Sequence, residues 1–191
     1  MKSSHLFKLA ATAALAMGMT SSAMAVGSNT AKVTFTGNIV DSPCSITIET
    51  QDQTVDMGQS IGNGTLTNGR ESTHRPFQID LEGCTFTTEQ NMNVVFSVGA
   101  GTTSATGATD NLALMNTNGT GPISNVSLAL GDENSNAIKL GDTFVKPLTM
   151  DGTVGAAKQS LHFNAWLIGA STGTVGTGEF SSAANVTISY L

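Results

Sequence analysis

Few side chains in this sequence could carry out chemistry. Beyond the N-terminal 25 residues the histidines are His74 and His162, which are far apart and belong to no His-x-x-x-His pattern. A general base or a metal site built on histidine normally shows a closer spacing or a partner motif. Pairing of the two histidines in space stays open, but we favour two separate surface or strand histidines.

Two segments imitate binding loops without completing them. The glycine-rich run Gly62–Gly69 lacks both the third glycine of a dinucleotide loop and the Gly-Lys-Ser/Thr ending of a phosphate loop. A calcium-loop spacing begins at Asp132, but Ala137 and Thr143 stand where that loop needs glycine and glutamate. No Gly-x-Ser-x-Gly elbow is present. We therefore expect no catalytic residue, no metal site and no cofactor, and a protein that is not an enzyme.

The charge balance excludes other classes of function. The chain has 191 residues, of which 12% are charged, and its 14 acidic residues outnumber 8 basic ones to give a net charge of -6. A nucleic-acid partner would require a basic surface, so we expect none. The same sign opposes docking on anionic lipid. Abundant Gly, Thr, Ser and Asn favour strands and turns over helices.

Residues 1–25 are typical of a secretory signal peptide. Lys2 and Lys8 precede the short apolar run Leu9–Met19, and Ala23–Ala25 is an A-x-A cleavage site. A membrane anchor is the alternative, but the run is about half of the ~20 residues that span a bilayer. We expect a mature chain that starts near Val26 and is exported.

Export favours a disulfide between the two cysteines, Cys44 and Cys84. Oxidising compartments form disulfides by default, and no C-x-x-C motif suggests zinc or redox chemistry. The chain-entropy model gives such a bridge about 4 kcal/mol of stabilisation at most. Two buried free thiols are the alternative.

The mature chain alternates in the manner of β-strands. No window carries a helical i, i+3, i+4, i+7 stripe, and Gly- and Thr-rich connections separate the runs. The expected strands are 32–40, 44–49, 77–81, 92–98, 126–130, 161–168 and 185–191. Short strands between turn clusters predict a single all-β domain, a sandwich or a small barrel.

The two ends carry the most informative alternation. Val33, Phe35, Gly37 and Ile39 share one face of the range 32–40, which the pattern predicts to be a half-buried strand. A second strand ends the sequence, and an unpaired apolar edge there would invite another strand to add. That strand places three apolar side chains on one face: Val186, Ile188 and Tyr190. The alternative is that the N-terminal segment is the domain's own first strand.

The residues from Lys32 to Ile46 (KVTFTGNIVDSPCSI) resemble the N-terminal signature of chaperone–usher pilins, the major fimbrial subunits of P-pilus-rod and type 1 type. At the other end, Tyr190 is the penultimate residue and Gly178 is the fourteenth from the end, as in the C-terminal motif of these proteins. Either motif alone would be weak, but together they are specific.

The resemblance implies an incomplete immunoglobulin-like β-sandwich that lacks its seventh strand. Residues 1–25 would be the signal peptide, 26–40 the N-terminal extension running into the first strand, and 41–191 the pilin domain. Val33, Phe35, Gly37 and Ile39 would form a donor strand that completes a neighbouring subunit. The recipient groove and chaperone motif would consist of Gly178, Val186, Ile188, Tyr190 and Leu191.

In function, the resemblance implies a structural subunit of an adhesive cell-surface fimbria. It would pass through the periplasm and polymerise non-covalently by donor-strand exchange. Its partners would be other copies of itself, a periplasmic chaperone that anchors the Leu191 carboxylate, an outer-membrane usher and tip adhesin subunits. The alternatives are a minor or terminating pilus subunit and a secreted carbohydrate-binding β-sandwich.

Overall fold

The computed structural model describes residues 31–191 and divides the chain between Ile39 and Val40 into two units. The predicted signal peptide and the start of the extension lie outside the described residues. Residues 31–39 of the first unit form neither helix nor strand. The second unit contains all the regular structure of the described chain.

Short elements open the second unit and long strands form its frame. The elements of the first half are β1 (Ser45–Ile46), α1 (Ile48–Gln51), the 3-10 helix η1 (Asn63–Gly69), β2 (Arg75–Glu82), β3 (Asn91–Val98), β4 (Ser104–Ala105), β5 (Ala108–Asn116) and β6 (Pro122–Asp132). Those of the second half are β7 (Ala137–Ile138), β8 (Thr143–Pro147), β9 (Met150–Asp151), β10 (Val154–Gly155), β11 (Gln159–Gly169), β12 (Phe180–Ser181) and β13 (Ala184–Tyr190).

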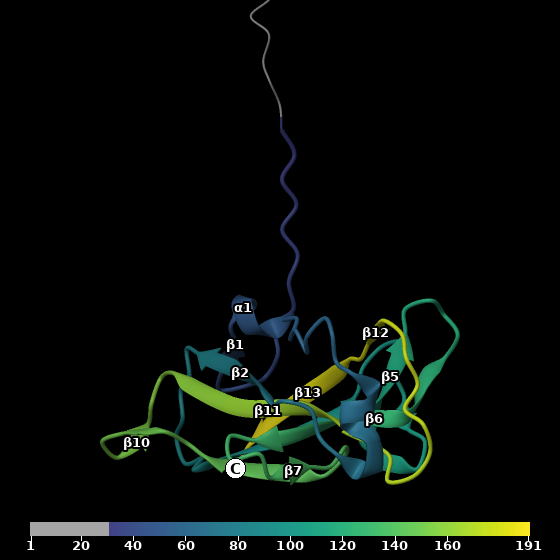
Figure 1. Ribbon diagram of the computed structural model, residues 1–191. Coiled ribbons are helices and arrows are strands. Elements are labelled where there is room, and N and C mark those ends of the chain that lie inside the picture. Colours follow the sequence, from purple (N-terminus) through teal and green to yellow (C-terminus); the bar gives the residue numbers. More distant parts are fainter. Residues whose placement is uncertain (1–30) are drawn as a thin grey trace, which may run out of the picture. The chain divides into compact units, whose positions relative to one another are not determined.

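These strands form two antiparallel sheets and a small hairpin (Figure 1). The large sheet has the order β1-β2-β11-β6-β5-β12, with β4 beside β5 and β7 beside β6. The small sheet has the order β13-β3-β8, and β9 pairs with β10 alone. Most connections between the long strands pass from one sheet to the other, as in a sandwich, whereas β5 and β6 are neighbours in the large sheet.

The core lies between the sheets and is built on aromatic contacts. Phe96 of β3 meets Phe163 of β11 edge to face, with ring centroids 5.0 Å apart. Phe144 of β8 and Phe77 of β2 contact the same ring at 6.2 and 5.5 Å. These contacts join both sheets into one apolar cluster, in which Phe96 and Phe163 are fully buried.

Most of the expected strands are confirmed. The ranges 77–81, 92–98, 126–130, 161–168 and 185–191 coincide with β2, β3, β6, β11 and β13. The prediction of a half-buried strand over 32–40 is wrong for the single chain, because this range enters no β-ladder. The alternative of the domain's own first strand fails for the same reason.

The expected strand over 44–49 is only partly present. β1 ends at Ile46, and α1 follows after Thr47. The Thr47 N–H donates to the carbonyl of Asp80 in β2, and the Thr47 and Thr50 hydroxyls hydrogen-bond at 2.9 Å. These bonds hold one helical turn against the edge of β2, so local polar bonding overrides the apolar alternation.

The predicted disulfide between Cys44 and Cys84 is confirmed. It ties the residue before β1 to the chain beyond β2, and both cysteines are buried. Within residues 31–191, no helix is long and apolar enough to cross a membrane.

Candidate functional site at the open edge of the last strand

β13 is hydrogen-bonded along one edge only. Its ladder pairs it with β3, and no described strand lies along its other edge. The Leu191 N–H donates to the Asn91 carbonyl at 2.9 Å, and the Asn91 N–H donates back to Leu191 at 3.0 Å. The Gly99 N–H donates to the Ala183 carbonyl at 2.8 Å at the other end of the ladder.

These bonds determine which backbone groups of β13 are open. Bonded pairs alternate in an antiparallel ladder, so Asn185, Thr187 and Ser189 also bond to β3. The N–H and C=O groups of Val186, Ile188 and Tyr190 therefore point to the open edge. We call these three residues, with the unpaired backbone beside them, the acceptor edge.

The side chains of the acceptor edge face the core without being enclosed by it. Val186, Ile188 and Tyr190 are half-buried and pack against the main apolar cluster, whereas the residues between them are exposed. The Tyr190 ring lies 5.9 Å from the Phe86 ring. Burial raises the pKa of the Tyr190 hydroxyl, and a hydrogen bond with Ser42 partly opposes this. The edge thus joins unpaired backbone to a partly covered apolar surface.

A second segment resembles a strand that has no partner. Residues 53–62 carry no helix or strand, yet Val55 and Met57 are half-buried and Asp56 between them is exposed. Met57 and Ile61 pack against the same apolar cluster as the acceptor edge. Sequence reasoning missed this segment, although its alternation of Val55 and Met57 is visible in the sequence.

A small apolar cavity lies beside the chain that leads into β12 and β13. It encloses about 90 Å³. Its lining includes Ile61, Leu66, Leu114, Ile123, Leu167 and Phe180. Gly178 also lines it with a φ of +151°, and a Cβ there would lie 2.6 Å from Asn116 Nδ2. The glycine is therefore required where the chain passes Asn116.

The predicted donor residues are uncovered in the single chain. Val33, Phe35 and Ile39 are 68%, 89% and 100% exposed. A Cβ on Gly37 would meet no atom within 4 Å. Three large apolar side chains in water are unfavourable, since each would gain about 1.5–3 kcal/mol by full burial.

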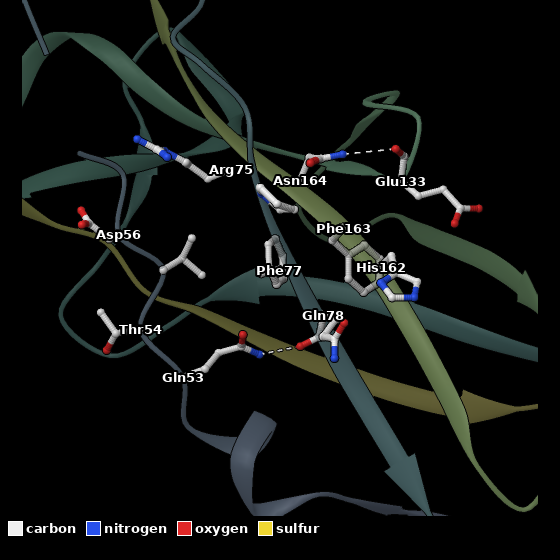
Figure 2. A pocket seen from close by; sticks show the side chains of 12 residues that line it. Gln53, Thr54, Asp56, Arg75, Phe77, Gln78, Glu133, His162, Phe163 and Asn164 are labelled. Atoms are coloured by element: carbon white, nitrogen blue, oxygen red, sulfur yellow. Dashed lines mark hydrogen bonds between the residues drawn. The ribbon is translucent and has the colours of Figure 1, made fainter.

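A second cavity, of about 630 Å³, is lined by both polar and apolar side chains (Figure 2). Residues 53–56, the first half of β2 and residues 162–164 of β11 line it. Two side-chain amides in its lining already hydrogen-bond to the protein's own backbone. Gln53 Nε2 donates to the Gln78 carbonyl at 2.8 Å, and Asn164 Nδ2 donates to the Glu133 carbonyl at 3.3 Å. The Glu133 carboxylate is paired with Lys146 at 2.7 Å.

The two histidines are not brought together. His162 pairs with Gln78 across the ladder of β2 and β11, whereas His74 stacks on Trp166 at 4.3 Å. His162 and Trp166 are four positions apart on β11, which is about 13 Å at ~3.3 Å per residue. Across residues 31–191 no group of three or more His, Cys, Asp or Glu side chains is placed to hold a metal ion.

The two loop imitations have structural roles. Gly62–Gly69 contains η1, whose Leu66 is buried. The Asp132 carboxylate accepts the backbone N–H groups of Asn134 and Asn136 at 2.8 Å and the Asn136 amide at 2.9 Å. Burial raises the pKa of Asp132, but these bonds outweigh it and leave the pKa below its usual value.

A family model described as "Fimbrial protein" matches residues 33–191, which is most of the sequence. The chain belongs to the fimbrial protein family. It is 39% identical over 184 residues to the Fimbria A protein of Serratia marcescens, covering 96% of this chain and 97% of that one. It is 32% identical over 169 residues to the major MR/P fimbria protein of Proteus mirabilis, covering 88% and 89% of the two chains. Both of these relatives are fimbrial subunits rather than enzymes.

Solved structures agree on the fold of the fimbrial protein. A chaperone–usher pilus structure matches with a TM-score of 0.66 and 24% identity, over 87% of this chain and 98% of that one. The P pilus rod subunit PapA matches with a TM-score of 0.60 and 20% identity, over 78% and 100%. The fold is an incomplete immunoglobulin-like sandwich, as the resemblance implied.

Proposed function

We propose that this fimbrial protein is a structural subunit that polymerises by donating residues 32–40 to the acceptor edge of another copy. One observation carries the proposal: β13 ends the small sheet with unpaired backbone above half-buried apolar side chains. A single chain that carries both an open edge and an unpaired strand-like segment is incomplete. A second copy supplies what is missing, in the manner of β-augmentation.

The two surfaces match in period. In a β-ladder, residues that face each other across two strands point their side chains to the same side. The donor's Val33, Phe35 and Ile39 would thus lie over the core beside the inward side chains of β13. Gly37 would bring the two backbones together where a side chain is not accommodated. A slip of one residue would bury Thr34 and Thr36 instead, so the pattern fixes the register.

The assembly would be a fibre rather than a closed ring or dimer. Donor and acceptor are different surfaces of the same chain, so each copy gives one strand and receives one. Head-to-tail contacts of this kind propagate when the rotation between copies does not close. No enzymatic step is needed, because the bonds formed are hydrogen bonds and apolar contacts.

Export would precede assembly. Residues 1–25 would direct the chain to the periplasm, where a chaperone would cover the acceptor edge until an outer-membrane usher passes the subunit to the growing fibre. Leu191 closes the ladder and is 66% exposed, so its carboxylate is accessible to a basic residue of the chaperone. Tip adhesin subunits would join the same fibre at its end.

The test is electron microscopy of cells that make the wild-type chain, no chain, or the Phe35→Asp chain. We expect filaments in the first case only, because a carboxylate at position 35 opposes burial. Loss of a tip structure with intact filaments would indicate a minor subunit. Normal filaments from the Phe35→Asp chain would contradict donation by residues 32–40.

A further inference from the structure

We propose that Pro147, together with Pro76, closes the edges of β8 and β2 to strand addition, so that an added strand is directed to β13 and the fibre does not branch through these two edges. This inference rests on the proposed function, since it explains why an added strand chooses one edge. A subunit that polymerises through an open edge risks pairing through every other edge that it exposes.

β8 is the opposite edge of the same small sheet. The Leu148 N–H donates to the Gln90 carbonyl at 3.0 Å, immediately beyond the ladder in which Lys146 faces Met92. Alternation of bonded pairs therefore directs the backbone of Lys146 towards β3. The backbone of Thr143, Val145 and Pro147 consequently faces the open side of β8.

Two features of β8 oppose the addition of a strand there. Pro147 occupies an open position and has no N–H to donate. Lys146 shares the half-buried inner face of β8 with Phe144, where it reaches Glu133 at 2.7 Å. An inward charge on a short edge strand is a recognised barrier to edge pairing. Val145 is nevertheless 53% exposed, so an edge with a restored N–H would be apolar enough to associate.

The edge of β2 beyond its two residue pairs with β1 is closed in a similar way. The Asp80 carbonyl accepts the Thr47 N–H, and the Gln78 carbonyl accepts the Gln53 amide, so even-numbered residues of β2 face this edge. Pro76 is the next residue of that parity and lacks an N–H. α1 and the side chain of Gln53 thus cover part of the edge, and Pro76 continues the block.

β13 has none of these features. Its residues Ala184–Tyr190 include no proline and no charged side chain. The backbone N–H and C=O groups on its open edge belong to Val186, Ile188 and Tyr190, whose apolar side chains face the core. The contrast between β13 and β8, two edges of one sheet, is what assigns strand acceptance to β13.

The experiment removes fibre growth and then restores one N–H. The starting protein is the full mature chain with Phe35→Asp, mixed with a peptide of residues 31–41 that fills the acceptor edge. Pro147→Thr is added to this protein, and Pro122→Thr is the matched control. Pro122 lies on the side of β6 where the Gly176 N–H already donates to Ser124, so the same change creates no open edge there. Sedimentation velocity measures association.

We expect the Pro147→Thr complex to form dimers as concentration rises, while the Phe35→Asp and Pro122→Thr complexes stay monomeric. In the donor-intact chain, Pro147→Thr should add branches or lateral bundles to the filaments. Monomeric Pro147→Thr protein would overturn the inference and leave the proposed function standing. Unimpaired filaments from Phe35→Asp would instead overturn the proposed function, on which the inference rests.

Pro147→Ala guards against a folding defect, since it restores the same N–H with a smaller side chain. A folded Pro147→Ala protein, shown by a native-like circular dichroism spectrum, should also dimerise. Its staying monomeric would overturn the inference.

Discussion

Replacing Phe35 by alanine in the proposed donor strand tests the proposed interface quantitatively. The Phe35 side chain is 89% exposed in the single chain, so nearly its whole surface leaves water if it enters a neighbour's core. Full burial of a phenylalanine is worth about 2–3 kcal/mol. That difference corresponds to binding that is about 30- to 150-fold weaker.

The assay is isothermal titration calorimetry of synthetic 31–41 peptides into the full Phe35→Asp chain. The wild-type peptide is compared with Phe35→Ala and with Thr34→Ala, whose side chain faces away from the core in the proposed register. All three peptides lose the same backbone freedom on binding, so the difference isolates the side chain. We expect the Thr34→Ala peptide to bind within a few-fold of the wild type.

Equal weakening by Phe35→Ala and Thr34→Ala would refute the reasoning, because it would mean that neither side chain is selectively buried. A Phe35→Ala peptide that binds as tightly as the wild-type peptide would also refute the reasoning.

Three further predictions concern the stability of the pilin domain with the peptide bound. Gln159 is 2% exposed, and its side-chain amide donates to the Thr149 and Ala156 carbonyls and accepts the Thr149 N–H. Gln159→Leu should therefore lower the free energy of unfolding, measured by urea titration, by about 1–3 kcal/mol. An unchanged urea midpoint would contradict this. Reducing the Cys44–Cys84 disulfide should cost up to about 4 kcal/mol, measured by the same titration with and without dithiothreitol; equal midpoints would count against it. Hydrogen bonds from backbone N–H groups, the largest contribution coming from Thr87 and smaller ones from Glu89 itself and Thr88, lower the pKa of Glu89 from 4.5 to about 2. The stabilisation that the Glu89 carboxylate gives is therefore complete above pH 4.5 and is lost as the pH falls towards 2. Glu89→Gln should make the thermal midpoint depend less steeply on pH over that range. An unchanged dependence would contradict this role of Glu89.

The long strands could be predicted from the sequence because their side chains alternate between core and solvent. In β11, Leu161, Phe163 and Ala165 are buried and His162 is exposed, which is the pattern that periodicity detects. The disulfide followed from the expected compartment. The strand and disulfide predictions both depend only on local sequence or on composition, and neither needs knowledge of distant contacts.

Other elements could not be predicted because partners distant in sequence decide them. The alternation of residues 32–40 is as regular as that of β11, but a strand also needs a neighbouring strand, and no described strand pairs with this range. β5 carries consecutive buried residues, Leu112, Ala113 and Leu114, which obscure its period. The open side of β13 was suggested by its position at the end of the chain, yet only the ladder with β3 identifies which amides are free.

Hydrogen exchange of the amides of β13 tests the central claim most directly. The N–H groups of Val186, Ile188 and Tyr190 face the open edge, whereas that of Thr187 bonds to β3. Two-dimensional NMR of the Phe35→Asp chain should show the first three amides exchanging fast without the 31–41 peptide and slowing strongly with it, while Thr187 stays protected throughout. If all four amides are protected before the peptide is added, or if the peptide slows none of the three, β13 is not the edge that receives the strand.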